Sequence, residues 1–422
     1  MIVARSLKAN VLFYLAGTAI YALSQWLLVI MYARADGPTG VGLFAMASAI
    51  SAPLIVLSQM SMRQVLIADV GKRFSFRDYL TARWTLSTVA VAATIVVAVI
   101  IGYRGSALMT VAAFATGRAF ESISDIFYGR SQAHGGLGRV ALYTGVRGVV
   151  TLLATGGVML ATHSMVASAF AFAAASVICQ MMVRVVEGRL FTDEGSTRAR
   201  LSRALLLHSA PLAISLFLIS LTAYAPRLTL QHFGGERLVG QASTVEYFLS
   251  LGLLGVAALG QASSSPIANA YHSGDRAAFV RLVTIIALAA AAMGVGIVLA
   301  AYLIGRQAIL ALYGPSFTEA ASAATAIIAG GAFSYLASML GFALSATGRY
   351  DRMIGWSVAV LAVTIAGSYT MVGIFGLTGL GYALAASGLV NILGYLLLLR
   401  QACRRMPTGA AEDSPARRLA HG

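Results

Sequence analysis

Long apolar stretches separated by short polar gaps run through the whole chain. A helix needs roughly 20 mostly apolar residues to cross a bilayer, and no gap is long enough to hold a folded domain. The pattern therefore predicts an all-α polytopic membrane protein with about 12 transmembrane helices. We expect them near residues 10–32, 41–62, 80–102, 106–129, 140–161, 165–186, 204–230, 239–262, 282–304, 320–346, 354–375 and 378–399.

The composition supports this prediction. Hydrophobic residues make up 59% of the 422 positions and charged residues only 11%, whereas soluble domains carry about 45–50% and about 25%. The chain has too few polar residues to cover a globule, which excludes a soluble enzyme and a disordered chain. Cys179 and Cys403 are too few for a disulfide framework.

The net charge of +15 follows the expected topology. Positively charged residues collect on the cytoplasmic side of membrane proteins, and most of the 30 Lys and Arg residues fall in alternate gaps, Arg63 and Arg83 among them. We therefore place both termini in the cytoplasm, as an even number of spans requires, and expect no nucleic-acid partner. The opposite gaps hold only Arg34, Arg104, Arg237 and Arg306.

Two halves of the chain resemble each other in one loop. When the second half is laid over the first, Gly37, Val41 and Gly42 align with Gly235, Val239 and Gly240. The spans divide six and six at the longest basic gap, so we expect two six-helix bundles around a central cavity. Such two-bundle proteins alternate access to a substrate path between the halves, which favours a transporter. The predicted domains are residues 1–202, 203–400 and a cytoplasmic tail at 401–422.

Charged residues inside the spans are the strongest indication of function, because charge at membrane depth is costly. Arg118, Glu121, Asp125 and Tyr128 recur at spacings that place them on one face of the fourth span. Arg147 of the fifth span should lie at the depth of Glu121. Two interpretations remain open: an ion-pair network that locks two helices, or residues that line a hydrated cavity.

A second polar site lies in the second half of the chain. Pro226 and Arg227 close the seventh span, and Glu246 lies near the start of the eighth. Proline within a span frees a backbone carbonyl, which is tolerated beside a cavity or a neighbouring helix. The alternative is that Arg227 extends to the outer head groups.

Signatures of bond chemistry are missing from the sequence. It contains no Gly-x-x-x-x-Gly-Lys-Ser/Thr phosphate loop, and its histidines have no metal-ligand spacing. The external loops are too short for a membrane glycan polymerase or ligase. We therefore expect a carrier without cofactors or metal, and no catalytic residues.

Several segments resemble the Wzx-type polysaccharide-repeat (O-antigen) flippases of the multidrug/oligosaccharidyl-lipid/polysaccharide exporter superfamily. The order and spacing of these segments together are specific to this type. Twelve spans also fit this type better than the peptidoglycan lipid flippases, which tend to have fourteen. The segments that carry the resemblance are 37–44, 125–133, 211–215, 226–227, 240–247, 266–279, 312–317 and 375–382.

The resemblance implies a flippase of the bacterial inner membrane that moves polyprenyl-diphosphate-linked oligosaccharide units by alternating access, for surface polysaccharide biosynthesis. Its partners would be the lipid-linked oligosaccharide, membrane lipids and Na+ or H+ as coupling ion. A drug or metabolite cation antiporter of the same fold is the alternative. The substrate-binding candidates are Arg118, Arg147 and Arg227, and the ion-coupling candidates are Glu121, Asp125 and Glu246.

Overall fold

The computed structural model describes residues 7–69, 73–191, 201–348 and 350–406, and within these ranges the chain is helical without strands. Short turns connect the helices. Their bounds are α1 Leu7–Gln59, α2 Met62–Ala68, α3 Phe76–Ile101, α4 Gly105–Ala133, α5 Leu137–Thr151, η1 Leu152–Gly156, α6 Gly157–Thr162, α7 Met165–Leu190, α8 Arg203–His272, α9 Arg276–Tyr313, η2 Pro315–Phe317, α10 Thr318–Ser345, α11 Tyr350–Phe375 and α12 Leu377–Arg404.

Nine helical segments of the described residues are long and apolar enough to cross a membrane. Two of them, Leu12–Ala68 and Arg203–His272, have 57 and 70 residues. At about 1.5 Å per residue both greatly exceed the roughly 30 Å hydrocarbon core. Each is broken near its middle, at Gly37 or Gly235, and therefore crosses twice; the first also includes the short α2 after a second break at Met60 and Ser61. The charged helix α4, with 29 residues, is a further crossing. The chain is thus a multi-pass membrane protein, and the predicted all-α fold with twelve spans is confirmed.

The two breaks occur at glycines that the sequence comparison aligned. Gly37 has φ 65° and ψ −157°, and Gly235 has φ 62° and ψ −163°. Side chains with a Cβ atom essentially never adopt this region of backbone conformation. The prediction of polar loops at these places was wrong, because each helix continues up to its glycine and resumes directly after it.

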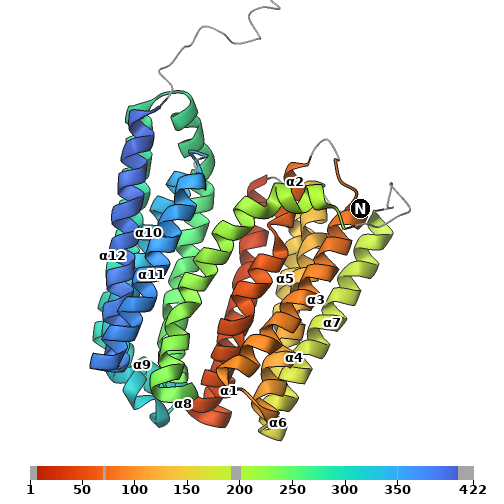
Figure 1. Cartoon of the computed structure of the whole chain (residues 1–422), viewed down its shortest axis with the longest axis vertical. Helices are drawn as coiled ribbons and strands as arrows, with labels where there is room; N and C mark the ends of the chain where they lie inside the picture. The colour runs from red at the N-terminus through yellow and green to blue at the C-terminus, as the bar shows by residue number, and fades with distance from the viewer. Residues whose placement is uncertain (1–6, 70–72, 192–200, 349, 407–422) are drawn as a thin grey trace, which may run out of the picture.

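The helices form two groups, with α8 running diagonally between them (Figure 1). Helices α1 to α7 lie in one group and α9 to α12 in the other. The groups meet where α1 and α8 bend, which we call the kink end. They diverge toward the opposite end, where α1 begins and α12 ends, which we call the chain-end face.

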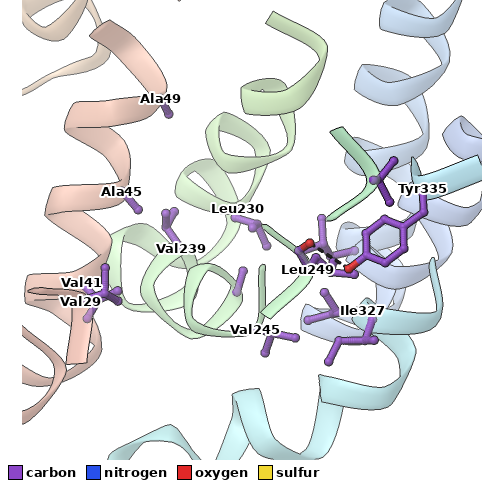
Figure 2. Packing of buried hydrophobic residues seen from close by; sticks show 14 of the residues in the cluster. Val29, Val41, Ala45, Ala49, Leu230, Val239, Val245, Leu249, Ile327 and Tyr335 are labelled. Atoms are coloured by element: carbon purple, nitrogen blue, oxygen red, sulfur yellow. Dashed lines mark hydrogen bonds between the residues drawn. The ribbon is translucent and has the colours of Figure 1, made fainter. Parts of the chain in front are cut away.

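Close backbone contact joins the groups at the kink end. A Cβ atom on Gly42 would overlap the carbonyl oxygen of Glu236, and one on Gly240 would overlap the carbonyl oxygen of Pro38. Glycine at both positions lets α1 and α8 cross without side chains between them. Figure 2 shows Val41 and Ala45 of α1 beside Val239 of α8 in the same apolar core.

The domain boundaries expected after residues 202 and 400 remain predictions. Residues 192–200 and 407–422 lie outside the described residues, so most of the predicted tail and most of the segment between α7 and α8 are not described. The start of α8 packs on the first group of helices, because Leu205 is buried in one cluster with Met62 and Tyr79.

Candidate functional site

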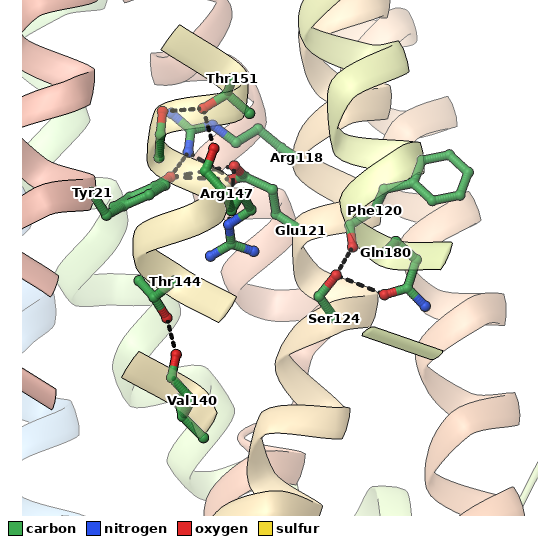
Figure 3. A network of polar contacts seen from close by, with 11 residues as sticks. Tyr21, Arg118, Phe120, Glu121, Ser124, Val140, Thr144, Arg147, Thr151 and Gln180 are labelled. Carbon is green, nitrogen blue, oxygen red and sulfur yellow. Dashed lines mark hydrogen bonds and ion pairs between the residues drawn. The ribbon is translucent and has the colours of Figure 1, made fainter. Parts of the chain in front are cut away.

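Two arginines share one glutamate within the first group of helices. Arg118 Nη1 lies 2.9 Å from Glu121 Oε2, and Arg147 Nε lies 3.8 Å from Glu121 Oε1 (Figure 3). The Tyr21 hydroxyl accepts a hydrogen bond from Arg118 Nη1 at 3.1 Å and donates to Glu121 Oε1 at 3.3 Å. The expected common depth of Arg147 and Glu121 is confirmed. We call Arg118, Glu121 and Arg147 the central triad.

Helix packing explains why these side chains meet. Arg118 and Glu121 are three residues apart on α4, so they lie on one helix face. Helix α5 approaches α1 closely, since a Cβ atom on Gly148 would lie 2.7 Å from Tyr21 Cα. This contact places Arg147 beside Tyr21, and its guanidinium lies 5.2 Å from the ring centre of Tyr21 and 5.4 Å from that of Tyr128.

The central triad is partly exposed, and some of its N–H groups have no hydrogen-bond partner. The Arg118 side chain is 27% exposed, whereas Arg147 and Glu121 are 11% and 10% exposed. Nε and Nη1 of Arg147 are buried without a hydrogen-bond partner among the described residues. Two guanidinium groups therefore face one carboxylate, and the triad has a net positive charge and free N–H groups.

Asp125 belongs to a different cluster. Its Oδ1 lies 2.7 Å from Arg63 Nη1 and its Oδ2 lies 3.6 Å from Arg83 Nη2. Arg63 also donates to Gln132 Oε1 at 2.9 Å. We call Arg63, Asp125 and Arg83 the second triad. The structure brings Glu121 together with Arg118 and Arg147 but separates Asp125 from them by one turn of α4.

Arg83 is the functional candidate that the sequence analysis missed, since it was counted among the gap charges. It lies two turns inside α3, and its side chain is fully buried. A signal was present in the sequence. Ser75 and Asp78 form a capping box that begins the helix at Phe76, which places Arg83 within a span.

The remaining pair, Arg227 and Glu246, lies on the two arms of α8. Arg227 Nη2 is 2.7 Å from Glu246 Oε2, and both side chains are about six-sevenths buried. The guanidinium also stands 5.0 Å from the ring centre of Tyr224. Arg227 thus pairs inside the protein, against the alternative that it extends to the head groups. Among the described residues its contacts are thus with α8 itself, and the pair joins the two arms of this helix across the break at Gly235.

The donors of this region suit an anion better than a metal. Guanidinium groups bind phosphate and carboxylate oxygens through paired N–H donors. Among the described residues, no three His, Cys, Asp or Glu side chains are grouped so that they could hold a metal ion. The arrangement can therefore hold an acidic group at membrane depth, beside the tyrosine rings.

Comparison with known proteins gives one similar sequence and several similar structures, and no family model matches the chain. The capsular polysaccharide biosynthesis protein CapF of Staphylococcus aureus is 21% identical over 381 residues, which cover 89% of this chain and 94% of CapF.

Solved structures of transporters align over nearly the whole chain. The MATE multidrug transporter DinF-BH is 16% identical over 96% of both chains, with a TM-score of 0.70. A multidrug resistance MATE family transporter of the MOP superfamily aligns in its inward-facing conformation, at 15% identity over 97% of this chain and 98% of that chain, with a TM-score of 0.65. An outward-facing conformation aligns at 14% identity over 94% and 96%, with a TM-score of 0.66. The chain therefore has the fold of the MATE transporters of the MOP superfamily, with their two helical bundles.

Proposed function

We propose that this protein is a flippase that moves polyprenyl-diphosphate-linked oligosaccharide units across the bacterial inner membrane for surface polysaccharide biosynthesis. The observation that carries the proposal is the central triad, in which two arginines face one carboxylate at membrane depth and keep N–H donors free. The similarity to CapF, a capsular polysaccharide biosynthesis protein, supports the same substrate class.

A diphosphate fits the central triad by charge and by geometry. Charge-assisted hydrogen bonds from guanidinium to phosphate are short and often bidentate. Arg118 is the most exposed member of the triad, and Arg147 beside it has two buried N–H groups that make no hydrogen bond to the described residues. Arg227 of α8 is a third buried arginine, paired with Glu246 at 2.7 Å. These three arginines are the proposed substrate-binding residues.

The transport cycle would follow from the shape of the fold. The two groups of helices meet at the kink end and diverge toward the chain-end face (Figure 1). If the chain-end face is cytoplasmic, as the distribution of positive charge predicts, this conformation faces inward. The halves 1–202 and 203–400 would then rock about the crossing of α1 and α8, with both termini in the cytoplasm.

The carboxylates are candidates for coupling to Na+ or H+. Glu121, Asp125 and Glu246 each pair with at least one arginine. Binding of a cation or a proton to such a carboxylate would compete with its arginine partner and release that arginine for the substrate. The protein would act as a carrier and make or break no covalent bond.

A deletion strain complemented with variants tests the proposal. Without the protein, lipid-linked units should accumulate on the cytoplasmic side and surface glycan should be lost. Arg118→Gln and Arg147→Gln should fail to restore flipping. The matched control is Arg139→Gln, which also removes an arginine paired with a carboxylate, Glu187, but leaves the central triad intact.

Two results would contradict the proposal. Normal flipping in the deletion strain would exclude the flippase, and drug or metabolite efflux without a glycan phenotype would establish the antiporter that the MATE fold also permits. Normal flipping by both triad variants would leave the substrate class intact but show that the central triad only locks helices.

A further inference from the structure

The second triad repeats the arrangement of the central triad one turn further along α4. Asp125 follows Glu121 by a single helical turn, a rise of about 6 Å. Each carboxylate lies between two arginines from different elements: Arg118 and Arg147 for Glu121, Arg63 and Arg83 for Asp125. The face of α4 therefore carries two clusters with the same excess of guanidinium groups.

Arg83 has more hydrogen-bond donors than partners. Its side chain is 0% exposed, yet Nε and Nη2 have no hydrogen-bond partner within the described residues. Nη1 donates to Ser122 Oγ at 3.2 Å, and the carboxylate of Asp125 is 3.6 Å from Nη2. A buried guanidinium is costly unless its donors are satisfied, so an acceptor with more oxygens than Asp125 offers would bind favourably here.

The carboxylate of the second triad is partly accessible, unlike the carboxylate of an ion pair nearby. Arg63 and Asp125 are 20% and 23% exposed, close to the value for Arg118. In the Arg139–Glu187 pair among α4, α5 and α7, the carboxylate is 0% exposed and the arginine 21% exposed. Arg63 bonds to Gln132 at the end of α4, so the second triad lies on the chain-end side of the central triad.

Tyr128 connects the two triads. Its ring lies beside the Arg147 guanidinium at 5.4 Å, and Tyr128 follows Asp125 by three residues on the same face of α4. An anion that leaves the second triad would thus meet the next pair of arginines after one helical turn, where the Tyr128 ring lies beside Arg147.

We propose that the second triad is a second binding site for a phosphate or diphosphate group, on the path between the chain-end face and the central triad. This inference rests on the proposed function. Asp125 holds the place of the anion, and an arriving diphosphate takes over its contacts with Arg63 and Arg83.

A substitution at Asp125 separates this proposal from a helix-locking role. If Asp125 occupies an anion site, Asp125→Asn removes the competing charge and should tighten anion binding. Charge-assisted hydrogen bonds are strong enough for a gain of about tenfold or more. If the triad only ties α2 and α3 to α4, the same change weakens the fold and leaves anion affinity as it was.

The experiment uses the purified full-length protein in lipid nanodiscs, with inorganic pyrophosphate and farnesyl diphosphate as probes in titration calorimetry. The background variant carries Arg118→Gln, Glu121→Gln and Arg147→Gln, which silences the central triad without leaving Glu121 unpaired. Adding Asp125→Asn should raise the affinity for both probes, and further adding Arg63→Gln should abolish it. The control Glu187→Gln neutralises a buried, arginine-paired carboxylate of the same group and should change nothing.

Each outcome decides the proposal. A folded Asp125→Asn protein, judged by its gel-filtration profile and thermal unfolding, with unchanged pyrophosphate affinity would overturn it, as would an equal gain in Glu187→Gln. The gain with pyrophosphate is measured without flipping, so it establishes the second site even if lipid-linked oligosaccharide is not transported. In that case the proposed substrate, and not the second site, would be wrong.

Discussion

The crossing of α1 and α8 at the kink end allows a quantitative test of how the molecule closes. A Cβ atom on Gly240 would overlap the carbonyl oxygen of Pro38 and lie 2.9 Å from the backbone nitrogen of Gly42. Ordinary contacts between carbon atoms are about 3.5–4.0 Å. Because both neighbours are backbone atoms, no side-chain rotation can relieve the overlap in Gly240→Ala, and α1 and α8 must move apart.

The expected cost comes from two opposing terms. Overpacking a tight contact costs typically about 1–3 kcal/mol, and alanine recovers up to about 1 kcal/mol of helix propensity over glycine. A conformation that opens the kink end loses the contact and keeps only the gain in propensity. The difference of about 1–3 kcal/mol between the two conformations should lower the population closed at the kink end roughly tenfold.

Distances between spin labels on the two groups of helices measure this population. Gly188 of α7 and Arg400 of α12 are exposed positions near the chain-end face, and Cys179 and Cys403 would be replaced by alanine. Gly240→Ala should shift the distance distribution toward a second, shorter maximum. The control is Gly355→Ala in α11, where a Cβ atom meets nothing within 4 Å.

An unchanged distance distribution in Gly240→Ala, with thermal stability equal to that of the Gly355→Ala control, would refute this reasoning. The crossing of the two kinks would then tolerate separation at no cost, and closure of the kink end would depend on other contacts.

Three further predictions concern contacts between and within the groups. Arg34 of α1 donates to the backbone oxygens of Ala311 and Leu312, the latter at 2.8 Å, and so caps the end of α9. Arg34→Ala should therefore increase the labelling, by an impermeant maleimide, of a cysteine placed at the kink end. Arg34→Lys should increase this labelling less. Trp26 Nε1 donates to the Tyr313 hydroxyl at 2.8 Å, so Trp26→Phe should lower the free energy of unfolding by about 0.5–1.5 kcal/mol, measured in denaturant titrations. Glu246→Gln leaves Arg227 without its charge partner and should lower the free energy of unfolding by about 3–5 kcal/mol. The double variant Arg227→Met/Glu246→Leu should recover most of the thermal stability. Failure to recover it would show that the two residues do more than neutralise each other.

The spans of this fold were predictable because the bilayer dictates them. Hydrocarbon thickness sets the length of each apolar stretch, so the twelve spans could be found without knowledge of any contact. The positions of the two breaks could also be found in the sequence, at Gly37 and Gly235, because the backbone conformation at these breaks requires glycine. The error was to expect loops there, because sequence patterns do not reveal whether two helices join directly.

The candidate site was predictable where spacing along one helix or depth in the membrane determined it. The spacing of Arg118 and Glu121 on α4 implied their ion pair, and counting residues from the basic gaps put Arg147 at the same depth. Asp125 shows where this reasoning stops. It shares the helix face of Glu121, but its partners Arg63 and Arg83 come from α2 and α3.

By itself the sequence determined that the chain enters a membrane, how often it crosses, and which charges are held inside it. These properties depend on the cost of placing polar groups in hydrocarbon, which acts on each segment separately. Only the tertiary structure decided which arginine shares which carboxylate and where the two groups of helices touch. Those outcomes depend on close packing between distant segments, such as Gly42 against Glu236 and Arg83 against Asp125, and no local pattern specifies them.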